Sequence, residues 1–267
     1  MKLKELLPSI YHTVKLLLLG TKKIKAASNS FQVVVSLTTI PYRLGKVHIT
    51  IRSILVQDTP PEKIILWLHK DLQNSIPNSL KKLEGDIFEI RFSEISCPHL
   101  KLVETLKLYN NKPIVTCDDD MIYPSHWLPT LYKAHIEHSA TVIANFTRQI
   151  TYNKEGVINP YKTWHYNHGE DTEKLVPLGV GGVLYPPNSL YKEATNTKLF
   201  LTLCPKADDL WFKAMALLNN TMTYKLPETI DLIPVMFTQK VSLKKQNIEK
   251  DFNVKQWNNI TKHFNLK

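Results

Sequence analysis

The stretch PIVTCDDDMIYP, at residues 113–124, decides the fold class. Its first five residues are mostly apolar and β-rich, which predicts a buried strand, and the Tyr-Pro pair predicts the turn that follows. Asp118, Asp119 and Asp120 therefore stand at the carboxyl end of a strand, where open α/β sheets bind ligands. Carboxylates so close together repel one another unless a cation lies between them. A solvated acidic turn is the alternative interpretation.

The chain on either side of this stretch alternates strand and helix patterns. Apolar runs and helical spacing predict the following order: strand 33–37, helix 47–55, strand 64–68, helix 76–83, strand 88–92, helix 100–109, the strand before Asp118, helix 127–137 and strand 140–144. A repeated β-α-β order implies a mainly parallel sheet with helices on both faces. We therefore expect an α/β fold.

Composition narrows the class of protein. The 267 residues are 43% hydrophobic and 22% charged, which is typical of a folded chain with one large domain. A net charge of +10 favours anionic partners such as nucleotides or an anionic membrane. The basic residues are dispersed and match no nucleic-acid-binding motif, so no nucleic acid is expected as a partner. Cys97, Cys117 and Cys204 lack metal-binding spacing, which predicts free thiols in a reducing cytoplasm.

The first 28 residues differ from the rest. Apolar residues recur at helical spacing from Leu3 to Leu18, and lysines take other positions, so a basic amphipathic helix is predicted. The longest apolar run, residues 16–19, is far shorter than the roughly 20 residues that a spanning helix needs. Such a helix can lie on an anionic leaflet, and it can equally pack on the domain or on a second subunit. The oligomeric state does not follow from the sequence.

The second half holds a polar loop and a glycine-rich stretch. Residues 152–173 predict a long loop. We expect this loop to be functional, because structureless loops of that length are unusual. Its His165, His168 and Glu170 are an alternative source of the acceptor base, and an ordinary surface loop is the other interpretation of this stretch. Residues 178–185 hold three of the eight glycines, which favours either a kinked strand or a close approach to a ligand.

A second acidic pair, Asp208 and Asp209, stands at the amino end of a predicted helix. One interpretation is helix capping and compensation of the helix dipole. The other is a general base toward an acceptor hydroxyl, because two adjacent carboxylates exceed what capping needs.

Six stretches, in the same order, resemble a group of bacterial GT-A glycosyltransferases that build capsule, lipopolysaccharide and other surface glycans. They are VSLTTIPYR (35–43), SILVQ (53–57), PHLKL (98–102), TCDDDMIYP (116–124), GVLYPP (182–187) and CPKADDLW (204–211). The resemblance covers roughly residues 31–220. It implies a Rossmann-like GT-A sheet, in a single domain over residues 29–267 that follows the amphipathic helix of residues 1–28.

The same resemblance implies a set of site residues. Asp120 and Asp118 would form a DXD motif that holds Mn²⁺ or Mg²⁺ against the diphosphate of a nucleotide sugar, with a UDP-sugar favoured. Asp209 would deprotonate the acceptor, and Asp208 would position it. Residues expected to contact the donor are Thr38, Pro41, Arg43, Lys101, Asp118, Asp119, Gly181 and Gly182. Cys97 stands where the family pattern has glycine, so the shape of that loop departs from the family.

The function implied is metal-dependent transfer of a sugar to a glycan or lipid-linked acceptor, in the cytoplasm or at the inner face of the cytoplasmic membrane. Inversion is the expected course, because a second carboxylate suffices without a covalent intermediate; a retaining course stays open. Two alternatives remain at this point: a catalytically inactive binding subunit of a glycan-assembly complex, and a metal-dependent nucleotidyltransferase.

Overall fold

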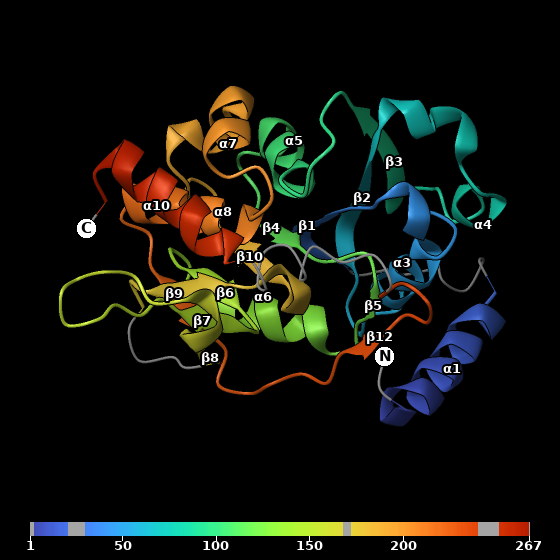
Figure 1. Cartoon of the computed structure of the whole chain (residues 1–267). Helices are drawn as coiled ribbons and strands as arrows, with labels where there is room; N and C mark the ends of the chain where they lie inside the picture. The colour runs from blue at the N-terminus through green and yellow to red at the C-terminus, as the bar shows by residue number, and fades with distance from the viewer. Residues whose placement is uncertain (1–2, 21–29, 168–171, 240–250, 267) are drawn as a thin grey trace.

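The computed structural model describes residues 3–20, 30–167, 172–239 and 251–266. At its centre lies a seven-stranded sheet in the order β11-β6-β10-β4-β1-β2-β3 (Figure 1). Its strands are β1 (Phe31–Thr38), β2 (Pro61–His69), β3 (Phe88–Ser93), β4 (Ile114–Thr116), β6 (Val142–Ala144), β10 (Val183–Tyr185) and β11 (Thr223–Lys225). All neighbours pair in parallel except β10, which runs antiparallel to β4 and β6.

Helices cover both faces of this sheet. They are α3 (Val47–Leu55), α4 (Asn78–Lys81), α5 (Leu100–Leu108), α6 (Trp127–Glu137), α7 (Thr197–Leu203), α8 (Asp208–Leu218) and α10 (Phe252–Phe264). Val33 and Val35 of β1 pack with α3 and α6, whereas Val34 between them packs with α5. Successive side chains of a strand point to opposite faces, so β1 is buried on both sides. The predicted fold class is confirmed: a mainly parallel sheet surrounded by helices, consistent with a Rossmann-like GT-A fold.

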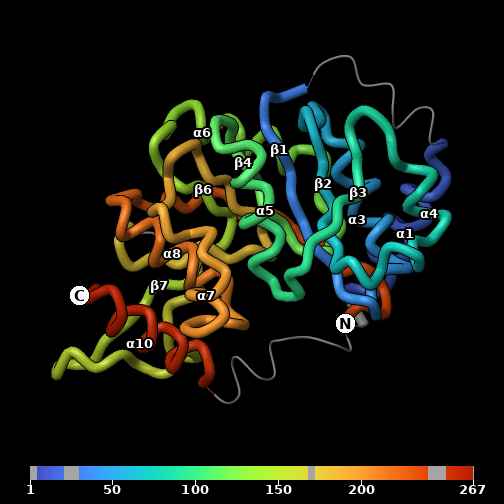
Figure 2. Tube along the Cα trace, turned by 90° about the horizontal axis from the view of Figure 1, so that it is seen from above, coloured from blue at the N-terminus to red at the C-terminus, as the bar shows by residue number. Residues whose placement is uncertain are grey.

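The remaining elements lie around this body. Helix α1 (Leu3–Leu18) packs beside α3 and β12 (Ile233–Pro234), and β12 pairs antiparallel with β5 (Met121–Ile122). Figure 2, seen from above, shows α1 and α10 at opposite ends of the molecule. None of the described helices is long and apolar enough to cross a bilayer.

Two predicted elements differ from the structure. The helix expected at 76–83 shrinks to α4, because Pro77 is its N-cap in extended conformation and disfavours helical geometry in the residue before it. The loop expected at 152–173 contains the short helix η3 (Tyr161–Thr163) and β8 (His165–Tyr166). Strand β8 pairs with β7 (Thr147–Gln149), which pairs in turn with β9 (Leu175–Pro177). His168 and Glu170 lie outside the described residues.

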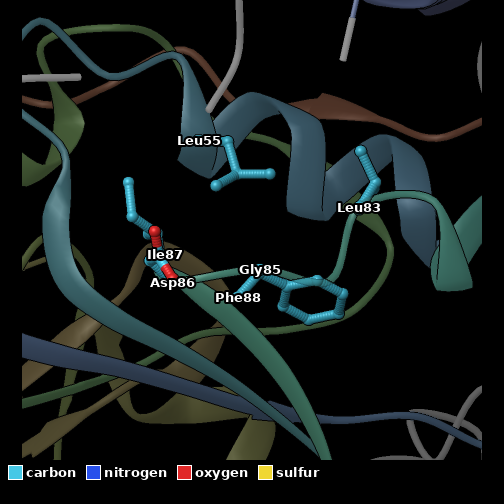
Figure 3. Close-up of a pocket in the computed structure, with 6 residues that line it drawn as sticks. All are labelled: Leu55, Leu83, Gly85, Asp86, Ile87 and Phe88. Carbon is cyan, nitrogen blue, oxygen red and sulfur yellow. The ribbon is translucent and has the colours of Figure 1, made fainter. Parts of the chain in front are cut away.

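A hollow of about 240 Å³ lies at the amino end of β3, between the ends of α3 and α4 (Figure 3). It is lined by Leu55, Leu83, Gly85, Asp86, Ile87 and Phe88. Because the strands around β3 are parallel, this hollow lies at the sheet edge opposite the carboxyl end of β4. It is therefore separate from the acidic stretch.

The residue that precedes β10 gives a test of the fold. Gly182 has φ of 88°, and a Cβ there would lie 2.6 Å from ring atoms of Trp127. We expect Gly182→Ala to lower the free energy of unfolding in urea by roughly 1–3 kcal/mol. Gly45→Ala is the matched control: a Cβ at Gly45 has no neighbour within 4 Å, so its effect should stay within about 0.5 kcal/mol. Equal losses in the two variants would contradict this explanation of the turn.

Candidate functional site

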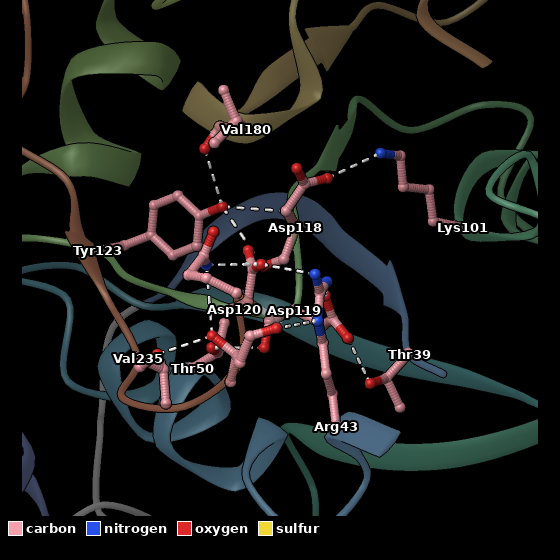
Figure 4. A network of polar contacts seen from close by, with 12 residues as sticks. Thr39, Arg43, Thr50, Lys101, Asp118, Asp119, Asp120, Tyr123, Val180 and Val235 are labelled. Carbon is pink, nitrogen blue, oxygen red and sulfur yellow. Dashed lines mark hydrogen bonds and ion pairs between the residues drawn. The ribbon is translucent and has the colours of Figure 1, made fainter. Parts of the chain in front are cut away.

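The parallel pairing of β4 with β1 places the three carboxylates at the centre of the sheet edge. The turn after β4 is held by Tyr123, whose hydroxyl accepts the Asp118 backbone N–H at 3.0 Å and donates to the carbonyl of Val180 at 3.1 Å. Figure 4 shows Asp118 turned toward Lys101, and Asp119 and Asp120 turned toward Arg43. Asp119 and Asp120 are buried, whereas the Asp118 side chain is 36% exposed. Asp118 is thus the carboxylate that a ligand reaches first.

Arg43 forms ion pairs with both buried carboxylates and partly compensates their charge. Its guanidinium lies 2.6 Å from Asp119 and 3.0 Å from Asp120, and its Nε donates to the carbonyl of Thr238 at 3.1 Å. Thr39 donates a further hydrogen bond to Asp119. The short helix η1 (Pro41–Arg43) carries Arg43 into this position, with Pro41 as its first residue. A direct contact of Arg43 with the donor remains a prediction.

Burial dominates the ionisation of this cluster. It raises the pKa of Asp120 to about 7, with a further increase from the charge of Asp118 and a decrease from Arg43. It also raises the pKa of Asp119, although Arg43 opposes the shift. Burial lowers the pKa of Arg43, but Asp119 and Asp120 outweigh it and the net shift is upward. The cluster therefore carries negative charge that one arginine does not fully compensate, which favours a bound cation.

Residues 233–239 contact the cluster from a distant part of the sequence. Val235 donates its backbone N–H to the Asp120 carbonyl at 2.8 Å, and the Gln239 amide donates to the Asp120 carboxylate at 2.9 Å. Gln239, Thr238 and Thr39 were not among the residues predicted from the sequence. No local pattern marks the first two, whereas Thr39 lies inside the quoted stretch 35–43.

Lys101 joins the two acidic stretches. Its ammonium lies 3.1 Å from Asp118 and 3.0 Å from Asp208, in nearly complete burial. Burial lowers the pKa of Lys101, but the charges of Asp118 and Asp208 outweigh it, so the pKa is well above its usual value and the side chain stays charged. The Ser36 hydroxyl of β1 donates to the Lys101 carbonyl, which fixes this end of α5 against the sheet.

Asp208 and Asp209 occupy the first turn of α8, as the sequence predicts. The N-cap itself is Ala207, and no side chain caps the helix there. Burial raises the pKa of Asp208, but Lys101 and His99 outweigh it and the net shift is downward. Burial and the charge of Asp208 raise the pKa of Asp209 well above its usual value. Two adjacent carboxylates whose pKa values are pushed apart form the arrangement that acid–base catalysis uses.

Glycine at position 179 allows the charged groups to converge. A Cβ there would lie 2.7 Å from the Lys101 ammonium, 3.2 Å from Asp209 and 3.4 Å from Asp118. Its backbone N–H also donates to Asp209 at 3.1 Å. The glycines predicted from the sequence were its neighbours instead. A Cβ on Gly181 would meet the ring of Phe146, as one on Gly182 would meet Trp127, so packing explains why both are small.

The remaining predicted site residue, Thr38, donates its hydroxyl to the carbonyl of Trp67 at 2.9 Å and so links β1 to β2. Its contact with a donor stays a prediction. The three cysteines are free, as expected.

Asp118 and Asp120 carry the kind of ligand atom that a hard divalent cation prefers, and a cation shared between them remains a prediction. Both offer carboxylate oxygens, and burial together with like charge raises the pKa of Asp120 to about 7, which a cation would relieve. Within the described ranges, no group of three or more His, Cys, Asp or Glu side chains is arranged to hold a metal. Mg²⁺ commonly takes one or two carboxylates and completes its shell with water and substrate phosphates.

Similarity to known proteins is found among solved structures. No family model matches the chain, and no curated protein matches it. The solved structures similar to it include residues 1–349 of S. aureus TarS, at 16% identity and TM-score 0.48, over 76% of this chain and 60% of that chain. They also include 4-diphosphocytidyl-2C-methyl-D-erythritol synthase from Anaerococcus prevotii, at 16% identity and TM-score 0.37, over 52% of this chain and 66% of that one. The chain thus spans less than two thirds of either structure.

The pKa of Asp120 yields a stability prediction. The folded state holds this proton more tightly than the unfolded state, so wild-type stability falls as pH rises from about 4 to about 7. We expect Asp120→Asn, measured in EDTA, to be more stable than wild type at pH 8.5 by on the order of 1–2 kcal/mol, with the gain lost at low pH. Asp86→Asn removes the same charge from an exposed site and is the matched control. A variant that loses stability most at high pH would contradict the assignment.

Proposed function

We propose that this protein is a divalent-metal-dependent glycosyltransferase that moves a sugar from a nucleotide sugar to a hydroxyl of a glycan or lipid-linked acceptor, with inversion, in the synthesis of a bacterial surface polysaccharide. One observation carries the proposal. Lys101 contacts Asp118 on one side and Asp208 on the other, so two acidic stretches 90 positions apart face one site. The stretch with Asp118 suits a cation that binds the donor diphosphate, and the stretch with Asp208 suits proton transfer.

On the donor side, the chain supplies cations and hard oxygen ligands. Asp118 and Asp120 would hold Mn²⁺ or Mg²⁺, whose charge would stabilise the diphosphate as it leaves. Lys101, beside Asp118, adds a fixed positive charge where negative charge develops on the leaving oxygen. Gly179 lets the backbone approach Lys101 and Asp118 closely, because a Cβ there would lie only 2.7 Å from the Lys101 ammonium.

On the acceptor side, Asp209 takes the proton of the attacking hydroxyl. A carboxylate with a raised pKa is a stronger base than an ordinary aspartate, and Asp209 owes its raised pKa to burial and to ionised Asp208. Lys101 keeps Asp208 ionised, and the Gly179 N–H orients Asp209. Direct displacement by the activated hydroxyl forms the new glycosidic bond as the bond to the diphosphate breaks, and the anomeric configuration inverts.

Donor binding followed by product analysis tests the proposed reaction. A thermal-shift screen of UDP-, GDP-, CMP- and dTDP-sugars should show stabilisation by one nucleotide class with Mn²⁺ or Mg²⁺, and EDTA should remove it. Asp120→Ala should abolish this shift, and Asp86→Ala should keep it. The product should be a nucleoside diphosphate with the sugar on an acceptor. Release of pyrophosphate would indicate a nucleotidyltransferase, and donor binding that ignores both EDTA and Asp120→Ala would refute the metal assignment.

The two aspartates of α8 separate catalysis from binding. A general base acts mainly in the transition state, so Asp209→Asn should lower kcat by on the order of 100- to 10,000-fold while donor affinity stays near normal. Asp208→Asn should lower kcat by a smaller factor, because Asp208 acts through Lys101 and Asp209. If Asp209→Asn turns over near normally and Asp208→Asn is inactive, then Asp208 is the general base and Asp209 the positioning residue. Normal turnover of both would leave the pair without a catalytic function.

A further inference from the structure

Helix α1 carries its apolar residues on the outside. Exposed apolar side chains recur every three or four positions along it: Leu7, Ile10, Tyr11, Val14, Leu17 and Leu18. We call this row the α1 stripe; its exposure runs from 39% at Ile10 to 81% at Leu18. The residues buried against the body include two polar ones, Ser9 and Thr13. A surface helix normally turns its apolar side chains to the core, whereas α1 leaves six large ones exposed.

Specific contacts hold α1 in this orientation. Ser9 donates its hydroxyl to the carbonyl of Pro234 at 2.7 Å, and Leu16 packs in a small cluster with Ile49, Ile122 and Val235. Arg52 of α3 donates to the carbonyls of Leu16 and Leu19, each at 3.0 Å, and so satisfies the carboxyl end of α1. Figure 1 shows α1 at the edge of the molecule. These contacts keep the α1 stripe on the solvent-exposed side of the helix.

Charge identifies what covers the stripe. Residues 1–28 contain six lysines and one acidic residue, Glu5, so they carry +5 of the chain's net +10. The lysines precede, interrupt and follow the stripe in the sequence: Lys2, Lys4, Lys15, Lys22, Lys23 and Lys25. An apolar stripe in a lysine-rich segment of the sequence matches a leaflet that is anionic at its surface and apolar below. A second copy of the chain would bring two strongly positive segments together, which electrostatic repulsion opposes.

We propose that α1 docks the protein on an anionic lipid surface, with the α1 stripe inserted among the headgroups. The docked helix is coupled to the candidate site through two consecutive residues. Ser9 bonds Pro234, and the next residue, Val235, donates its backbone N–H to the carbonyl of Asp120. The acidic cluster therefore keeps a fixed position relative to the lipid surface.

Sedimentation of the full chain with vesicles tests this surface. Phosphatidylcholine vesicles that contain phosphatidylglycerol should bind the protein more strongly than pure phosphatidylcholine vesicles, and the difference should shrink as salt rises. The double variant Leu7→Glu with Leu18→Glu should weaken binding about tenfold or more, because two apolar side chains are replaced by charges that the anionic surface repels. Both positions are highly exposed, so the fold should be unchanged. Ile136→Glu, at a 65% exposed site on α6, is the matched control and should bind as wild type.

Three results would overturn the proposal. They are wild-type binding by the double variant, equal binding to charged and neutral vesicles, and a dimer in light scattering that the double variant disperses without any vesicle binding. The last result would assign the stripe to a second copy of the chain. Donor binding without vesicles should be the same in wild type and double variant, so failure here is distinct from failure of the proposed function.

Discussion

A single buried ammonium organises this site. Lys101 is almost removed from water, and a buried charge is tolerated only when opposite charges compensate it. Asp118 and Asp208 supply that compensation from two separate elements, the turn after β4 and the start of α8. The same pairing keeps Asp208 ionised and thereby raises the pKa of Asp209. The convergence requires close approach of a backbone without a side chain, which explains glycine at position 179.

The second constraint comes from a segment outside the resemblance to known enzymes. Residues 233–239 contact the acidic cluster on one side and α1 on the other. Arg43 is bound at both ends, by Asp119 and Asp120 and by the carbonyl of Thr238. The segment thus fixes the guanidinium of Arg43 beside the buried carboxylates. It also connects the candidate site to the helix proposed to meet the lipid surface.

Local sequence patterns predict the helices and strands of this fold well, but they predict the contacts between these elements poorly. Apolar runs placed Asp118 at a strand end and Asp208 at a helix start, and β-α-β order implied a mainly parallel sheet, as observed. Contacts between distant residues leave no such pattern: Gln239 bonds Asp120 across 119 positions. The strand β8 was missed for the same reason, because its pairing partner β7 lies in another segment. Periodicity also predicted an amphipathic helix at the amino terminus without showing that its polar residue Ser9 faces inward.

A double-mutant cycle between Asp118→Asn and Asp208→Asn tests the role of Lys101 most directly. Substitutions at distant, independent sites change the free energy of unfolding by amounts that add to within about 0.3–0.5 kcal/mol. We predict that the double variant loses at least about 1 kcal/mol more than the sum of the single losses, because the second substitution removes the second of the two carboxylates in ion-pair contact with the buried ammonium. This excess should vanish when the cycle is repeated with Lys101→Met. Additive losses with Lys101 present would contradict the claim that one lysine holds the two acidic stretches together.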